Sequence, residues 1–173
     1  MSLSFWEKCR HFCSTINYDN SLKWLQYQIT RNSLKTNYVV NHFKPDVHPT
    51  CSFCKQQDMM ENISHLFWHC SYVGNFLLEA LQFLSSIGLY IYPSKNQFIF
   101  GVFNEASESP TNLVILILRK YIWRQKFKSS TLCLSELQGY LKAYLGDLKI
   151  MHEMQGRSEK FDCFNLLYNL LND

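Results

Sequence analysis

Three cysteines and one histidine in the run CSFCKQQDMMENISHLFWHC constrain the fold more than any other feature of the sequence. Cys51 and Cys54 form a C-x2-C pair, and His65 and Cys70 follow it with ten and then four intervening residues. Two thiols at this spacing can bind one metal ion from a tight turn, and a later His and Cys can complete a tetrahedron. The spacing therefore predicts a structural Zn²⁺ site with four protein ligands, Cys51, Cys54, His65 and Cys70.

The fourth ligand has a second candidate, His69. If residues 65–70 form an α-helix, His65 and His69 share a face, whereas Cys70 is rotated away by roughly a third of a turn. Helical geometry then favours His69, and the affinity of a thiolate for zinc favours Cys70. Unliganded core cysteines are the structural alternative. A redox C-x-x-C centre fits less well, because no strand-then-helix pattern surrounds the pair.

Length and composition indicate one folded domain, or one domain with a small appended module. The 173 residues are 47% hydrophobic and 16% aromatic, which is enough to form a core. The net charge of +3 does not by itself imply an anionic partner. The seven cysteines are an odd and scattered set, which is typical of a reducing compartment rather than of a disulfide framework.

Two features of the sequence bear on localisation. The N-terminus lacks the apolar run of a signal peptide, and the longest aliphatic run, 113–118, is too short to span a bilayer. We therefore expect an intracellular protein of the nucleus or cytoplasm, with no membrane partner.

Hydrophobic periodicity predicts a mainly α fold, a helical domain of about five helices with an inserted CCHC zinc knuckle. The predicted helices span residues 20–38, 64–88, 109–128, 135–154 and 161–171. Residues 89–103 are predicted to be a loop with one short strand or buried turn around 98–100. The sequence divides into an N-terminal extension (1–19), a helix–knuckle–helix region (20–88) and a C-terminal helical region (89–173).

The helix predicted at 109–128 ends in a run of cations that contains no acid. A helical projection places apolar residues on one side and the cations on the other, with Trp123 and Phe127 among them. The cations are Arg119, Lys120, Arg124, Lys126 and Lys128. Interleaved cations and aromatics suit phosphate neutralisation and base stacking in nucleic-acid binding. A solvated helix face is the alternative, and a cationic last turn also suits the helix dipole.

The helix predicted at 20–38 repeats this pattern more weakly. Its candidate nucleic-acid-binding cations are Lys23, Arg31 and Lys35, and Trp24 and Tyr27 accompany them. These residues lie away from the apolar stripe of the helix.

The cysteine-rich run resembles the zinc-binding knuckle in the C-terminal region of reverse transcriptases of non-LTR (LINE-type) retrotransposons. That knuckle commonly has the form C-x2-C, an acidic residue, then H-[aliphatic/aromatic]-F-x-x-C. The matching residues here are Cys51, Cys54, Glu61, His65, Leu66, Phe67 and Cys70. Downstream, Gly101 and the run from Lys120 to Trp123 match a glycine and a basic helix of the family. The resemblance covers about residues 20–150.

The resemblance implies a module that binds template RNA or target DNA, beside a polymerase domain supplied in trans or missing in cis. The sequence departs from the family at Glu61-Asn62, where an acid is usually followed by Thr, and at His69, which is often an acid. We find no paired-aspartate polymerase motif, no endonuclease constellation and no Gly-rich phosphate loop. We therefore expect neither enzyme activity nor a small-molecule substrate. The alternative is a protein-interaction or scaffolding module whose zinc is purely structural.

Overall fold

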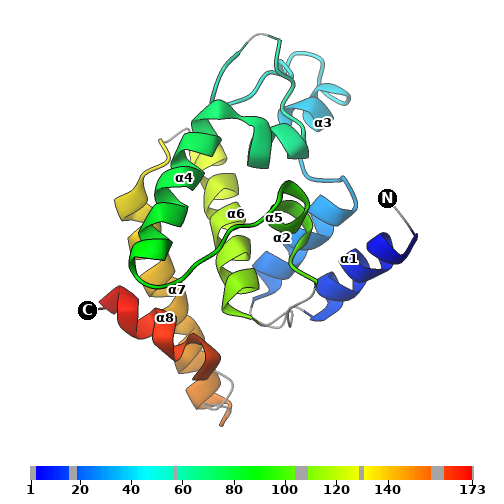
Figure 1. The fold of residues 1–173 in the computed structure, drawn as a ribbon. Helices are drawn as coiled ribbons and strands as arrows, with labels where there is room; N and C mark the ends of the chain where they lie inside the picture. The colour runs from blue at the N-terminus through cyan, green and yellow to red at the C-terminus, as the bar shows by residue number, and fades with distance from the viewer. Residues whose placement is uncertain are drawn as a thin grey trace.

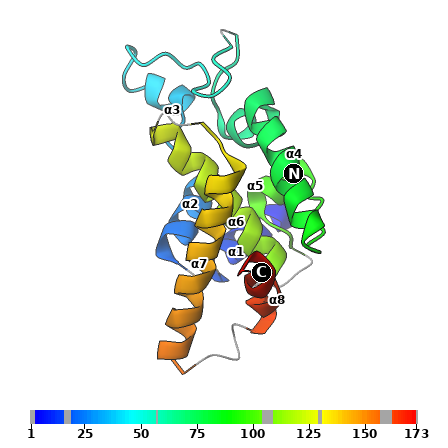
Figure 2. The ribbon, with the colours of Figure 1, turned by 90° about the vertical axis from the view of Figure 1, so that its left-hand side faces the viewer.

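The computed structural model describes residues 3–15, 19–56, 58–103, 109–128, 131–156 and 162–172. Figures 1 and 2 place α3 and the cysteine-rich segment at one end of a helical bundle and the carboxyl end of α7 at the other. The described helices are α1 (Leu3–Thr15), α2 (Asn20–Thr30), α3 (Asn37–Asn41), η1 (His65–His69), α4 (Ser71–Ser86), α5 (Lys95–Phe100), α6 (Pro110–Lys128), α7 (Leu134–Met154) and α8 (Asp162–Asn172). The predicted mainly α fold is confirmed, and the only strand-like pairing among these residues is the bridge between Thr50 and Met60.

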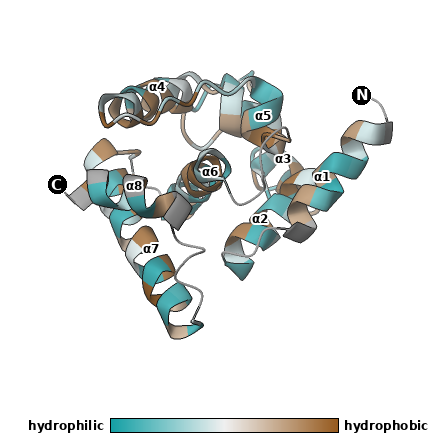
Figure 3. Cartoon of the chain, turned by 60° about the horizontal axis from the view of Figure 1, so that its bottom comes forward, coloured by the Kyte–Doolittle hydropathy of each residue, from teal (hydrophilic) through white to brown (hydrophobic). Residues whose placement is uncertain are grey.

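Helix α6 runs through the centre of the bundle, and the other helices surround it (Figure 3). Every residue from Asn112 to Arg119 is buried. A helix that is apolar on all sides must be enclosed by other elements, and α2, α7 and α8 contact it. None of the described helices has both the length and the hydropathy needed to cross a membrane.

Helices α6, α7 and α8 have nearly the predicted bounds, whereas the helix predicted at 64–88 divides into η1 and α4. Ser109 starts α6, because its Oγ accepts the Asn112 N–H at 3.2 Å. Gly88 ends the helix of α4 with φ 85°, a left-handed conformation in which the Leu89 N–H reaches the Leu84 carbonyl at 2.9 Å. Helices α7 and α8 also match their predicted ranges within one or two residues.

The helix predicted at 20–38 is wrong in its second half, because α2 stops at Thr30. Asn32 adopts φ 53°, which asparagine tolerates better than most residues. Its N–H donates to the Ile29 carbonyl at 3.1 Å, and the Ser33 N–H donates to the Gln28 carbonyl at 2.9 Å. These two bonds form a Schellman stop that the hydrophobic pattern does not reveal.

Two further segments form helices that the sequence analysis did not predict. Residues 95–100 form α5 rather than a strand, since Ser94 and Gln97 form a capping box, with the Ser94 N–H donating to Gln97 Oε1 at 2.8 Å. The N-terminal extension contains α1, which packs on α2. One cluster of buried hydrophobic residues extends from Phe12 to Leu171 and includes all three predicted regions.

The cysteines outside the knuckle behave mainly as small hydrophobic residues. Cys9 and Cys13 are buried, as predicted, whereas Cys133 is half-buried. None of these three forms a disulfide. The side chain of Cys163 lies outside what the structure describes.

We predict that Gly101→Ala lowers the free energy of unfolding by about 2–4 kcal/mol. Gly101 has φ 105°, and an added Cβ would lie 2.7 Å from the Phe12 ring. Gly139→Ala is the matched control, because nothing lies within 4 Å of its added Cβ on α7; it should stabilise the helix by about 0.5–1 kcal/mol. Urea unfolding measures both, and equal effects would contradict the close approach of α1 to Gly101.

Candidate metal centre and cationic surfaces

The four predicted ligands come together at the knuckle end of the bundle. Their ligand atoms all lie within 4.8 Å of one another. Cys51 Sγ is 3.7 Å from Cys70 Sγ, and Cys54 Sγ is 3.4 Å from His65 Nε2. Cys54 is half-buried and the other three are buried. Cys51, Cys54, His65 and Cys70 therefore lie close enough to hold a metal ion.

A tight turn presents the first two thiols. The Lys55 N–H donates to the Cys51 carbonyl at 3.0 Å, and Lys55 itself adopts φ 51°. The returning chain pairs with the entering chain, because the Cys51 N–H donates to the Met59 carbonyl at 3.2 Å. This pairing fixes the C-x2-C pair at the base of a short loop.

The other two ligands lie at the two ends of a π-helical turn rather than on an α-helix: His65 begins η1, and Cys70 caps it in an extended conformation. The Cys70 N–H donates to the His65 carbonyl at 2.8 Å, an i→i+5 bond that makes the turn wider than an α turn. The bond holds Cys70 at the end of this turn, and the ligand atoms of His65 and Cys70 lie within 4.8 Å of each other. His69 is exposed, and its Nε2 accepts from Lys95 Nζ at 3.0 Å. The helical geometry that favoured His69 does not apply here.

Burial and hydrogen bonding bias the protonation of the ligands. Burial lowers the pKa of His65, which favours the neutral imidazole that metals bind. Cys51 Sγ donates to Cys70 Sγ; this bond, followed by burial, raises the pKa of Cys51, and the same bond lowers the pKa of Cys70. The pair thus favours one thiolate, at Cys70, and a bound cation would favour the second.

Glu61 joins the knuckle to the rest of the molecule. Its side chain is fully buried and lies 2.7 Å from the ammonium of Lys126, in the last turn of α6. Glu61 Oε2 accepts the Ser52 N–H at 2.8 Å, and Oε1 accepts the Asn37 N–H at 2.9 Å. One carboxylate therefore binds the metal loop, the start of α3 and the end of α6.

The structure contradicts the prediction that Lys126 meets a phosphate. Only 6% of its side chain is exposed. Besides Glu61, Lys126 Nζ donates to Asn37 Oδ1 at 2.9 Å and to the Lys35 carbonyl at 3.4 Å. This cation holds the knuckle against α6 and cannot also contact a ligand.

The prediction that Arg119 lies on a cationic face is also wrong. Arg119 is fully buried, because α6 is central and has no solvent side at this depth. Its Nη1 donates to the Ile99 carbonyl and its Nε to the Ile115 carbonyl, so it ties α6 to the end of α5. Burial lowers the pKa of Arg119 to about 9, which still leaves a cation at neutral pH.

The remaining predicted cations of α6 lie toward its carboxyl end. Arg124 and Lys128 are exposed, and Lys120 is half-buried. The Arg124 guanidinium lies 5.6 Å from the centre of the Tyr140 ring. Trp123 meets Phe127 edge-on, with ring centroids 4.8 Å apart, and Phe127 is 63% exposed. We call this group the α6 surface: Lys120, Trp123, Arg124, Phe127 and Lys128.

Two of the three cations predicted on the first helix line a groove between α1 and α2. This α1–α2 groove has a volume of about 600 Å³ and contains Lys23 and Arg31, with Trp24 and Tyr27 beside them. Lys35 is exposed beyond the end of α2 and is not part of the lining.

A third cation of the groove, Arg10, is not predicted by the sequence analysis, which assigns residues 1–19 to an extension. The buried positions Cys9, Phe12 and Cys13 recur at helical spacing, and this pattern could have placed Arg10 on the outer side of a helix.

Comparison with known proteins identifies no relative. No protein-family model matches the chain, and neither does any curated protein or any solved structure. The resemblance to the LINE-type knuckle stays a prediction, carried by the cysteines, by His65 and by Glu61. The function is therefore inferred from the residues and their geometry.

We predict that Glu61→Gln lowers the free energy of unfolding by about 3–5 kcal/mol, because it leaves the Lys126 ammonium buried without a counter-charge. Glu79→Gln on the exposed side of α4 is the control and should change stability by less than about 0.5 kcal/mol. Urea unfolding with saturating Zn²⁺ measures both. Equal stability of the two variants would contradict the role of Glu61 as the link.

Proposed function

We propose that the chain is a zinc-stabilised module that binds nucleic acid and has no polymerase activity of its own. The α6 surface carries the proposal, because it places three cations and two aromatic rings at the end of a helix that the metal knuckle holds through Glu61. Cations neutralise phosphates, and exposed rings stack on bases. The partner in this proposal is RNA or DNA.

The donor set supports zinc as the metal. Three thiolates and one imidazole are the ligands of structural zinc sites, and they fill all four positions. Bond lengths in such sites place two sulfurs ~3.8 Å apart and a sulfur and a nitrogen ~3.6 Å apart in a tetrahedron. The separations of 3.7 Å and 3.4 Å between the two measured pairs are close to these values. Bound zinc would stabilise the fold of residues 51–70 and would take no part in a reaction.

The resemblance of the knuckle adds a family to the proposal. A LINE-type reverse transcriptase carries such a knuckle beyond its polymerase domain, and this chain would correspond to that tail. The polymerase domain would then lie in trans or in a missing part of a longer chain. Template RNA and target DNA are the ligands that this assignment suggests.

A protein-interaction module is the second candidate function. Several large apolar side chains that do not belong to the α6 surface project into solvent, including Phe43 at 83% exposure and Met60 at 55%. Exposed apolar groups of this size are typical of docking sites when they are contiguous. This candidate predicts that neither RNA nor DNA binds the wild-type protein in a salt-dependent way.

We predict that the purified protein contains one equivalent of zinc, as measured by mass spectrometry and elemental analysis. Cys70→Ser should lose the metal, because it removes a buried ligand atom. His69→Ala is the matched control and should retain the metal, since His69 binds Lys95 instead. Retention by Cys70→Ser together with loss by His69→Ala would overturn the ligand set.

We predict that replacing Lys120, Arg124 and Lys128 by alanine together weakens binding to single-stranded RNA and DNA. The slope of log affinity against log salt should fall by about 2, because each lost phosphate contact removes about 0.7. Lys142→Ala, an exposed cation of α7, is the control and should leave the slope unchanged. Filter binding across a salt series measures the slope. An unchanged slope in the triple variant would contradict the role of the α6 surface.

A further inference from the structure

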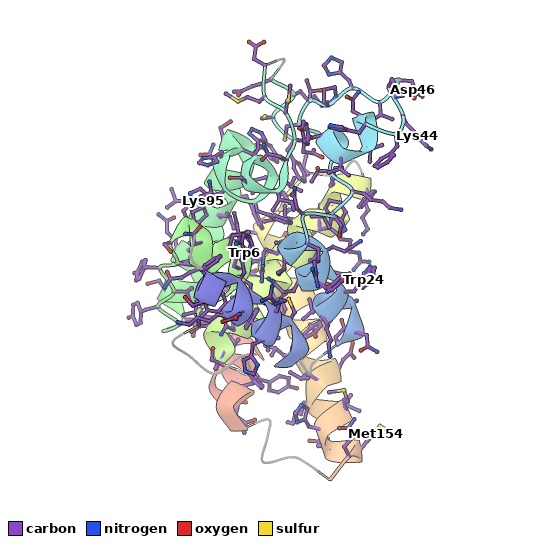
Figure 4. All side chains as sticks on the ribbon, turned by 90° about the vertical axis from the view of Figure 1, so that its right-hand side faces the viewer. Trp6, Trp24, Lys44, Asp46, Lys95 and Met154 are labelled. Carbon is purple, nitrogen blue, oxygen red and sulfur yellow. The ribbon has the colours of Figure 1, made fainter. Side chains whose placement is uncertain are left out.

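The α1–α2 groove has an aromatic wall that faces solvent. The rings of Trp24 and Tyr27 stack with centroids 5.4 Å apart and planes within 16° of each other. Trp24 is 59% exposed and Tyr27 is 42% exposed, and Figure 4 shows Trp24 on the outer side of α2. Neither ring is needed to fill the core, so the pair presents flat apolar surface to the groove.

A cation, Arg31, lies next to the Trp24–Tyr27 pair. The guanidinium of Arg31, the residue that caps the end of α2, lies 5.7 Å from the centre of the Tyr27 ring. Trp24, Tyr27 and Arg31 therefore form a row of three flat groups at helical spacing. Flat groups in such a row are suited to stacking on the bases of an unpaired strand.

The charge of the groove has one sign. Arg10 from α1, Lys23 from α2 and Arg31 at the end of α2 line it, and none of its described lining residues is acidic. The carboxylate of Asp19, just before α2, caps the helix, where it accepts the Ser21 N–H at 2.7 Å. The groove therefore attracts an anion, and its aromatic wall favours an anion that carries planar rings.

We propose that the α1–α2 groove is a second nucleic-acid site that binds an unpaired stretch of RNA or DNA. A base stacks on the Trp24–Tyr27 pair, and the adjoining phosphates lie beside Arg10, Lys23 and Arg31. A duplex is excluded from this contact because its bases are already stacked on one another. The proposal deepens the function proposed above and rests on it, since it adds a base-stacking site to the phosphate contacts of the α6 surface.

The position of the groove allows one strand to reach both surfaces. The chain that leaves α2 after Arg31 leads to Lys35, whose carbonyl accepts from Lys126 in the last turn of α6. Residues 31–35 therefore connect the groove to the end of the α6 surface. In this proposal, a nucleic-acid strand bound in the groove extends along residues 31–35 toward the cations of the α6 surface.

The test uses fluorescence anisotropy with labelled oligothymidylate and oligouridylate, a labelled duplex, and unlabelled polyphosphate as a competitor. The double variant Trp24→Ala with Tyr27→Ala should lower the affinity for both single-stranded oligonucleotides by about tenfold or more. Its affinity for the duplex and its competition by polyphosphate should stay unchanged. Trp24→Phe with Tyr27→Phe keeps two rings and should stay within about threefold of wild type. Because both side chains are exposed, circular dichroism should show an unchanged melting curve.

Several results would overturn the proposal, and they differ from failure of the function itself. One such result is unchanged single-strand binding in the double alanine variant together with weakened binding in the Lys120, Arg124 and Lys128 variant. It would contradict the groove site but leave the proposed nucleic-acid function in place. If the double alanine variant loses affinity equally for oligonucleotides and for polyphosphate, base stacking in the groove is contradicted. No binding of any nucleic acid by the wild type removes both, and so does binding only to vesicles of anionic lipid. A difference between oligothymidylate and oligouridylate supports the site and assigns it to DNA or to RNA.

Discussion

The ion pair between Glu61 and Lys126 holds the knuckle on the bundle, and the positions of both the metal ligands and the α6 surface depend on it. Burying two charges costs several kcal/mol per ion, and the pair repays this only when its remaining donors and acceptors are satisfied. Here both carboxylate oxygens of Glu61 accept backbone N–H groups, and the ammonium of Lys126 has two further oxygen partners. An apolar pair of equal size could fill the space, but it could not join these three backbone segments.

This link connects the candidate metal ligands to the α6 surface through Glu61 and Lys126. The metal ligands fix the loop that contains Ser52, whose N–H binds Glu61. Glu61 in turn holds Lys126 in the turn of α6 that also carries Trp123 and Phe127, and the Lys126 ammonium lies 5.3 Å from the centre of each ring. Loss of a metal ion held by these residues would therefore loosen the partner of Lys126, which lies beside both rings of the α6 surface.

Local spacing predicted those features of the fold that neighbouring residues determine. The C-x2-C turn, the helix start at 109 and the helix end at 88 each depend on a few adjacent residues, and the structure has all three. The wrong predictions concern features that residues distant in the sequence determine. The helical projection of α6 assumed that one side of the helix faces solvent. Other elements enclose α6 at Arg119, so this residue is buried. Glu61 and Lys126 are far apart in sequence, so no spacing could pair them, and the π turn at His65 departs from the α geometry that such projections assume.

The cations of the chain therefore divide into two kinds that the sequence does not distinguish. Arg119 and Lys126 are buried and bind carbonyl or carboxylate oxygens of the chain itself, so their contacts contribute to the stability of the fold. Arg10, Arg31, Arg124 and Lys128 are exposed beside aromatic rings or at the ends of helices. Only exposed cations can exchange counterions for phosphates, so only these residues would contribute to the salt-dependent binding proposed above. The weak net charge of +3 thus conceals two local surfaces of one sign, each built beside an aromatic pair.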